Sequence, residues 1–182
     1  MAFLLWGADA LSQAVIRTNA SGNWSNAATW VVVSGTDADG IPDADDDVII
    51  RGAAVVTVDV NSFANSVQVG GTNGFPLNGS GVLTFAAGGV TLSVTGGVTV
   101  GGFNNTVRNG TINFVSGANL VASSLTFSNP GPTLSTNNTI DMTAGGTLLW
   151  VPLLLIRLAG LSITGRQERE PWFSMQQTPC PR

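Results

Sequence analysis

The chain has 182 residues, of which 43% are hydrophobic and only 10% charged, and its net charge is −4. Its basic residues are seven arginines without any lysine, and they form no basic stripe, so the composition argues against nucleic-acid binding. Histidine is absent and the single cysteine is Cys180, which excludes Ser-His-Asp hydrolysis, histidine-based metal catalysis and a disulfide within the chain. A charged share well below the usual value of roughly 25%, together with 23 glycines, favours an extracellular β-protein of one domain.

Residues 1–16 begin with a short apolar run over residues 2–6. No basic residue precedes this run and Asp9 interrupts it, although residues 8–10 have the small-x-small pattern of a cleavage site. We interpret the segment as a degenerate or truncated signal region, or alternatively as an N-terminal segment that covers the end of the core. The run is too short to cross a bilayer as a helix, and no transmembrane span is predicted.

Residues 17–51 hold two tryptophans, Trp24 and Trp30, in a segment rich in serine and asparagine. A tryptophan offers a large apolar ring and an N–H group that needs a partner when buried. We expect both rings to cap the open end of a stacked β-core, where unpaired strand edges would otherwise invite association. The alternative is that both rings are exposed and stack on the sugar rings of a glycan.

The same segment continues as Pro42-Asp43-Ala44-Asp45-Asp46-Asp47-Val48-Ile49-Ile50, and Val56-Thr57-Val58-Asp59 follows. Together with Gly22-Asn23-Trp24-Ser25 and Thr29-Trp30, this pattern resembles the start of many bacterial secreted or surface proteins that fold as a right-handed parallel β-helix. The resemblance covers residues 20–147 and implies a β-helix that begins with a cap. Members of this family serve in adhesion, surface coating and polysaccharide processing, so the resemblance implies the fold more narrowly than the function.

Four aspartates in the loop over residues 37–46 are candidate ligands for calcium: Asp37, Asp39, Asp43 and Asp45. Calcium is bound by carboxylate, carbonyl and water oxygens, and a glycine lets such a loop turn sharply. The loop is similar to the calcium repeats of thrombospondin type 3, although Gly35 stands where those repeats have an aspartate, and no second repeat follows. The alternative is a solvated acidic turn in which Asp46 or Asp47 accepts hydrogen bonds from local backbone N–H groups.

Residues 52–151 consist of short apolar-polar alternations separated by glycine and asparagine. A period of two places the apolar side chains on one face of each strand and threonine, serine or asparagine on the other. The spacing of similar strands predicts rungs of roughly 20–26 residues that bury their apolar faces by stacking. The predicted fold is therefore an all-β, right-handed parallel β-helix with an N-terminal cap. The alternative is an antiparallel β-sandwich, because Asn109-Gly110 between alternating strands is also a strong hairpin signal.

Residues 152–182 differ in composition from the strands that precede them. They contain four of the seven arginines and both glutamates. Pro152 also interrupts the apolar burst over residues 148–156, which disfavours one continuous helix. We expect an atypical tail that is poorly ordered after about residue 165, as the end of a truncated or frame-shifted chain would be.

The strand region offers two carboxylates for acid-base chemistry, Asp59 and Asp141. In the predicted stack they lie roughly 15 Å apart, beyond the range of roughly 5–9.5 Å used by glycosidases. We therefore predict that the chain is not an enzyme but a secreted or cell-surface β-solenoid segment with a structural or adhesive role. The alternative is a carbohydrate-binding or polysaccharide-processing module on the same scaffold. Glycans or other surface proteins are the expected partners, and no cofactor is predicted apart from calcium in the acidic loop.

Overall fold

The computed structural model describes residues 13–70, 79–102, 109–128, 137–150, 154–156 and 162–165. Apart from a short 3-10 helix, η1 (Ala27–Thr29), the regular elements of these residues are all β-strands. Most of the predicted signal region, up to residue 12, and the tail from residue 166 onward lie outside the described residues. The interpretations of those two segments therefore stay predictions.

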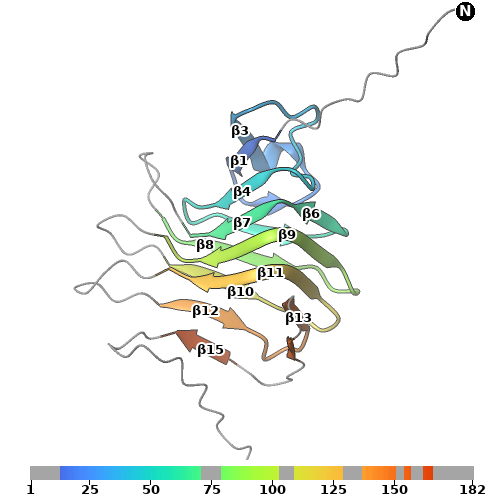
Figure 1. Ribbon diagram of the computed structural model, residues 1–182, viewed down its shortest axis with the longest axis vertical. Coiled ribbons are helices and arrows are strands. Elements are labelled where there is room, and N and C mark those ends of the chain that lie inside the picture. Colours follow the sequence, from blue (N-terminus) through green and yellow to red (C-terminus); the bar gives the residue numbers. More distant parts are fainter. Residues whose placement is uncertain are drawn as a thin grey trace, which may run out of the picture.

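The strands form two sheets that run along the same stack, coloured from blue to red in Figure 1. The nine-stranded sheet has the order β14-β13-β11-β9-β7-β4-β1-β3, and β6 also pairs with β9. Its strands are β1 (Val15–Thr18), β3 (Trp30–Ser34), β4 (Asp47–Ile50), β6 (Ser62–Ala64), β7 (Ser66–Val69), β9 (Thr91–Val100), β11 (Asn119–Phe127), β13 (Thr147–Trp150) and β14 (Leu154–Ile156). The six-stranded sheet has the order β15-β12-β10-β8-β5-β2. Its strands are β2 (Gly22–Asn23), β5 (Val55–Val58), β8 (Gly81–Phe85), β10 (Gly110–Asn113), β12 (Asn138–Asp141) and β15 (Ser162–Gly165).

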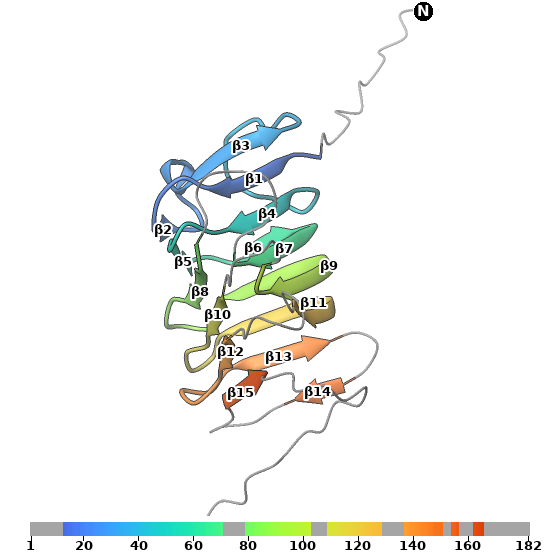
Figure 2. The same ribbon diagram turned by 90° about the vertical axis from the view of Figure 1, so that its left-hand side faces the viewer.

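Strands within the stack pair in parallel, as β5 does with β8, β8 with β10 and β9 with β11. The chain alternates between the two sheets as it advances, which makes a β-solenoid of about four turns (Figure 2). Antiparallel pairs lie at the two ends of the described stack, where β3 pairs with β1, β14 with β13 and β15 with β12. The prediction of parallel stacked coils is confirmed, and the antiparallel β-sandwich is wrong.

The hairpin signal at Asn109-Gly110 fails because of what these residues pair with. Gly110 begins β10 and lies opposite Gly81 of β8, a partner that belongs to the previous coil. The turn chemistry of asparagine and glycine suits a solenoid corner as well as a hairpin, because both residues tolerate the backbone conformations of tight turns. Only the identity of the partner strand separates the two folds.

The repeat is longer than the rungs of roughly 20–26 residues that the strand spacing predicted. Hydrogen bonds between adjacent coils join residues 27 positions apart for Ser123 and Gly96, and 28 positions apart for Gly110 and Asn138. Similar strands recur in the sequence after 15 residues from Leu83 to Val98 and after 14 from Val98 to Ile112. Each such step is half a coil, because it leads to the opposite sheet. Leu83 thus pairs with Ile112 in the six-stranded sheet, while Val98 between them belongs to the nine-stranded sheet.

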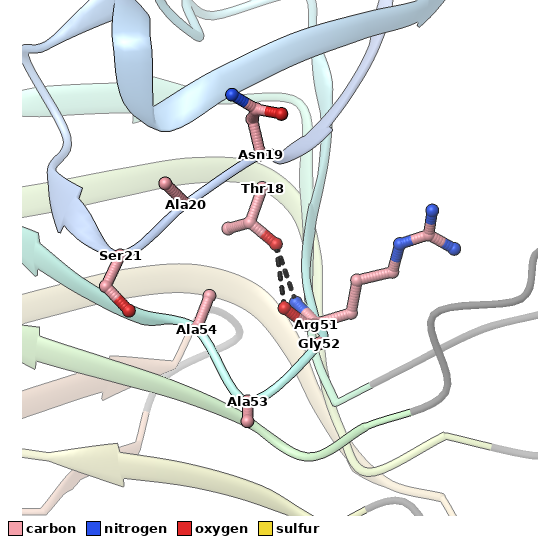
Figure 3. A pocket seen from close by; sticks show the side chains of 8 residues that line it. All are labelled: Thr18, Asn19, Ala20, Ser21, Arg51, Gly52, Ala53 and Ala54. Atoms are coloured by element: carbon pink, nitrogen blue, oxygen red, sulfur yellow. Dashed lines mark hydrogen bonds between the residues drawn. The ribbon is translucent and has the colours of Figure 1, made fainter.

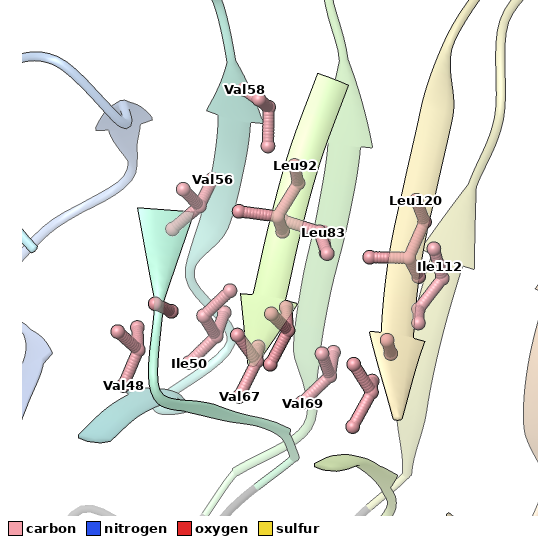
Figure 4. Close-up of a cluster of buried hydrophobic side chains, with 14 of the residues drawn as sticks. Val48, Ile50, Val56, Val58, Val67, Val69, Leu83, Leu92, Ile112 and Leu120 are labelled. Atoms are coloured by element: carbon pink, nitrogen blue, oxygen red, sulfur yellow. The ribbon is translucent and has the colours of Figure 1, made fainter. Parts of the chain in front are cut away.

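The core is a column of apolar side chains enclosed by the coils, part of which is drawn in Figure 4. In β8, Leu83 and Phe85 are buried. Val82, which precedes Leu83, and Thr84, which lies between the two, are partly exposed. Phe85 stacks on Phe114 of the next coil, with 5.0 Å between ring centroids. Because only the inward face of each strand is buried, apolar and polar residues alternate along these parallel strands. Parallel strands that are buried on both faces have continuous apolar runs instead.

Glycines allow the coils to approach closely at the corner before the six-stranded sheet. A Cβ atom on Gly110 would overlap the carbonyl oxygen of Val69 and the backbone nitrogen of Gly101. In the following coil this position is held by Asn138, which is buried. Its Oδ1 accepts a hydrogen bond from Gly110 N at 2.9 Å, and its Nδ2 donates to Ser128 O at 2.9 Å. The amide satisfies backbone groups that would otherwise be buried without partners.

Candidate functional site

Trp24 and Trp30 are packed into the N-terminal end of the core, with only 1% and 5% of their surfaces exposed. Their ring centroids lie 5.1 Å apart in an edge-to-face arrangement with an interplanar angle of 71°. Trp30 Nε1 donates to Trp24 O at 2.8 Å, and Trp24 Nε1 donates to Pro42 O at 3.3 Å. Both indoles therefore combine apolar burial with a satisfied N–H group. Neither ring leaves a face accessible to a sugar in this structure.

Three carboxylates of the acidic loop accept hydrogen bonds from backbone N–H groups two or three residues further along the chain. Asp37 Oδ1 accepts from Asp39 N and Gly40 N, both at 2.9 Å. Asp39 Oδ1 accepts from Ile41 N at 2.9 Å, and Asp43 Oδ1 accepts from Asp45 N at 3.2 Å. These contacts are Asx turns, at residues other than Asp46 and Asp47, which the alternative of an acidic turn named as acceptors.

Across the described ranges of the chain, no three acidic, cysteine or histidine side chains converge as a ligand set for a metal. The pKa of Asp43 is raised. The largest cause is a side-chain hydrogen bond with Asp45, and the next is burial. Calcium binding stays a prediction. A melting temperature that is higher in millimolar calcium than in EDTA would support it, because a ligand of the native state must raise stability.

Asp46 and Asp47 join strands that are distant in sequence. The carboxylate of Asp46, which is buried, accepts hydrogen bonds from Ala14 N and Asp43 N, both at 3.0 Å. Burial is the largest influence on the pKa of Asp46 and raises it, the carboxylates of Asp43 and Asp37 raise it further, and the two backbone hydrogen bonds oppose the shift without reversing it. The expected bond to a local N–H group is therefore present, and a second bond reaches the residue before β1. No pattern in the residues indicated that longer contact.

Asp47 extends the same network to the next coil. Its Oδ1 accepts hydrogen bonds from Asn65 Nδ2 at 2.9 Å and from Ser66 Oγ at 2.5 Å. Its Oδ2 accepts from Gln13 Nε2 at 3.0 Å. The two adjacent aspartates therefore fix the relative positions of β1, β4 and β7, which is a structural use of carboxylates.

Asp59 and Asp141 do not form a catalytic pair. Asp59 accepts hydrogen bonds from Ser25 N at 3.1 Å and Ser25 Oγ at 2.6 Å. Burial raises the pKa of Asp59, but hydrogen bonds from Ser25, from its own backbone and from Asn23 lower it, and the net shift is downward. The backbone N–H of Thr143 donates to Asp141 at 2.9 Å and lowers the pKa of that carboxyl. Both groups are therefore ionised at neutral pH, and neither is poised as a general acid.

These two carboxylates also lie too far apart to flank one glycosidic bond of a substrate. Asp59 directly follows β5 and Asp141 ends β12, and β8 and β10 lie between those two strands. Three strand steps of about 4.8 Å correspond to about 14 Å. This exceeds the carboxylate spacing of roughly 5–9.5 Å that glycoside hydrolysis requires.

The outward face of the six-stranded sheet carries a continuous row of neutral and acidic polar side chains, here called the polar row. The pairing register places its members side by side on successive strands: Asn23, Thr57, Thr84, Asn113 and Asp141. Each of these side chains alternates with buried core residues and is at least partly exposed. The row presents amide and hydroxyl groups at the spacing of the strands, about 4.8 Å.

A shallow hollow of about 100 Å³ lies between two corners of the chain, the one that follows β1 and the one that connects β4 to β5 (Figure 3). Its lining residues are Thr18, Asn19, Ala20, Ser21, Arg51, Gly52, Ala53 and Ala54. Thr18 Oγ1 donates to Arg51 O at 2.9 Å and accepts from Arg51 N at 3.0 Å, which ties the two corners together. The hollow has room for a few water molecules, and Arg51 is the one ionisable residue among those that line it. We assign it a structural role.

Comparisons with known protein families, curated proteins and solved structures find no match to this chain. Among the described residues, no helix has the length and apolar character needed to cross a membrane. The fold is therefore established from the structure alone, and the function is inferred from the surface.

Proposed function

We propose that the chain is a non-enzymatic, secreted or cell-surface β-solenoid segment with a structural or adhesive role. The polar row is the observation that carries this proposal, because it offers a long, repetitive contact surface and no reactive centre. The carboxylates support it too, since Asp46 and Asp47 bridge strands and Asp59 and Asp141 lie on separated coils. The low charged share and the family resemblance of the N-terminal pattern favour an extracellular setting.

The location can be tested in the organism that produces the protein. Fractionation should recover the chain outside the cell or on its surface, and protease added to intact cells should degrade the surface fraction. Recovery only from the cytosol, protected from added protease, would contradict the proposal. Incubation with a panel of neutral and acidic polysaccharides should release no product, and turnover of any one of them would contradict the non-enzymatic role.

Carbohydrate binding on the same scaffold is the second candidate. It is favoured by the amide and hydroxyl groups of the polar row, such as Asn23, Thr84 and Asn113, because these groups can both donate to and accept from sugar hydroxyls. Binding to a glycan array without turnover would support this candidate. A clean negative on the array would leave the structural role alone.

A further inference from the structure

A second outward row differs in character from the polar row. It lies on the other sheet, and the pairing register aligns Phe63 of β6, Ser93 of β9, Val121 of β11 and Leu149 of β13. We call these four residues the apolar strip. Phe63 is 52% exposed, while its neighbours Ser62 and Ala64 are buried, so its ring is on the outside of the coil.

The apolar strip is more than a single exposed side chain. Scattered exposed apolar residues are normal on protein surfaces, whereas contiguous ones mark binding sites. Here Phe63 lies in β6, and Val60, which is 47% exposed, lies three positions earlier in the bend before that strand. Ser93 separates Phe63 from Val121 and Leu149, which are adjacent in register and partly exposed. The polar row, which has the same outward orientation on the other sheet, has no apolar member.

A row of amides and hydroxyls runs beside the apolar strip. Its members in register are Asn61, Thr91, Asn119 and Thr147. Asn61 Oδ1 accepts a hydrogen bond from Thr91 N at 2.9 Å, and Asn119 Nδ2 donates to Thr91 Oγ1 at 3.4 Å. Within the described part of the chain, Asn61 Nδ2 has no protein partner, and Asn61 is exposed. The Oδ1 atom of this amide is held by the bond from Thr91 N, and its Nδ2 donor is presented to solvent.

We propose that the apolar strip and the row beside it bind a neutral glycan, with a sugar ring stacked on Phe63. This inference rests on the second candidate function and names its site and ligand class. A sugar has an apolar C–H face that an aromatic ring covers, and hydroxyls around its edge that amides and hydroxyls can bond. The strip and its flanking row supply both kinds of contact.

Charge selects the class of glycan. Neither aligned row contains a charged residue. The Asp47 carboxylate accepts hydrogen bonds from Asn65 and Ser66, the two residues that follow β6, and the chain carries a net charge of −4. An anionic polysaccharide would be repelled at this face, whereas a neutral one would not. The expected ligand is therefore an uncharged sugar polymer.

The test measures binding of the full chain to cellulose, β-1,3-glucan and mannan, with alginate as the anionic comparison. The wild type is expected to bind at least one neutral polymer and not alginate. Phe63→Ala should weaken that binding by about tenfold or more, because it removes the stacking surface. Phe63→Trp should retain binding, and Asn61→Ala should weaken it by a smaller factor. Val55→Ala is the matched control, since Val55 is 42% exposed on the other sheet, and it should bind like the wild type.

Each alternative outcome has a separate meaning. Failure of the wild type to bind any of the three neutral polymers would overturn this inference, while the fractionation experiment would still decide the proposed function by itself. Binding that Phe63→Ala leaves unchanged, or that Val55→Ala weakens equally, would also overturn it. Circular dichroism and thermal melting of every variant verify that a loss of binding is not a loss of folding. If Phe63→Ala does not fold, Phe63→Leu keeps the apolar area without the aromatic ring and should still bind more weakly.

Discussion

The N-terminal region and the coil stack hold their strands in place by different means. In the N-terminal region, residues 13–54, polar side chains reach between elements, as Asp46 does to Ala14 and Thr18 does to Arg51. In the coil stack, residues 55–150, apolar layers repeat and the backbone ladders of parallel strands set the register. One region depends on particular side chains and the other on repetition.

The difference follows from the regularity of the spacing. In the stack, register partners on adjacent coils lie 27 to 31 positions apart, from the pair Val55 and Val82 to the pair Val67 and Val98. In the N-terminal region, Asp46 contacts a residue 32 positions away and Asn65 contacts Asp47 across only 18 positions. Coils of unequal length cannot align by repetition, so specific hydrogen bonds are needed to fix their register.

The largest effect is expected from Trp24→Ala, which should break the N-terminal region selectively. Removing a buried indole costs about 3–5 kcal/mol of unfolding free energy. Hydrogen exchange should show loss of protection in residues 13–54 while the coil stack stays protected. Trp24→Phe is the control, because it keeps a buried aromatic ring while losing part of the ring volume and the hydrogen bond to Pro42, so its effect should be smaller. Equal loss of protection along the whole chain would show that the two regions unfold as one unit.

Ile112→Ala tests the stack in the same way. Ile112 is fully buried between Leu83 and Ile140 of the adjacent coils, and its truncation should cost about 2–5 kcal/mol in urea unfolding. The outward Thr111→Ala on the same strand should stay within about 0.5 kcal/mol of the wild type. A larger effect of Thr111→Ala than of Ile112→Ala would mean that the inward and outward faces are assigned the wrong way round.

Gly110→Ala tests whether close backbone approach at the corners sets the coil spacing. The added methyl group would meet backbone atoms of Val69 and Gly101, which cannot rotate away, so a loss of about 1–3 kcal/mol is expected. Gly97→Ala is the matched control, because its methyl group would meet only the hydroxyl of Ser124, which can rotate. Thermal melts of the two variants should therefore differ clearly, and indistinguishable melts would argue against the corner model.

The smallest effect is expected from pH. The pKa of Asp46 is raised above 3.8 in the folded chain, so the folded state binds a proton more readily than the unfolded state and gains stability as the pH falls toward 3.8. Asp59 has a lowered pKa, so its contribution is present above 3.8 and is lost as the pH falls through its folded value. The melting temperature of the N-terminal region should rise slightly from neutral pH toward 3.8 and then decline.

Two variants separate these contributions. Asp46→Asn should reduce the slight rise, leaving the part that comes from Asp43, whose pKa is also raised, and Asp59→Asn should reduce the decline at lower pH. Titration curves of both variants that coincide with that of the wild type would contradict the assignment. High salt should flatten the profile modestly, because part of the Asp46 shift comes from neighbouring aspartates of the acidic loop.

Much of the fold could be predicted from the residues, but the contacts of the candidate site could not. The alternation of β8 and the tryptophan-bearing pattern indicated stacked strands with a cap. Phe63 gave no signal, because an apolar residue in an alternating segment is normally assigned to the core. Its neighbours Ser62 and Ala64 occupy the interior instead, and small side chains suit the tight bend at Asn65 between β6 and β7.

The sequence by itself determined the local properties of the chain. The period of two determined which side chains share a face, and the glycines and asparagines determined where the strands end, since both effects act between residues close in sequence. Only the tertiary structure decided which strands are neighbours, and therefore that Phe63 aligns with Val121 and that Asp59 is remote from Asp141. The physical reason is that register between coils depends on the summed length of loops and corners, which no local preference encodes.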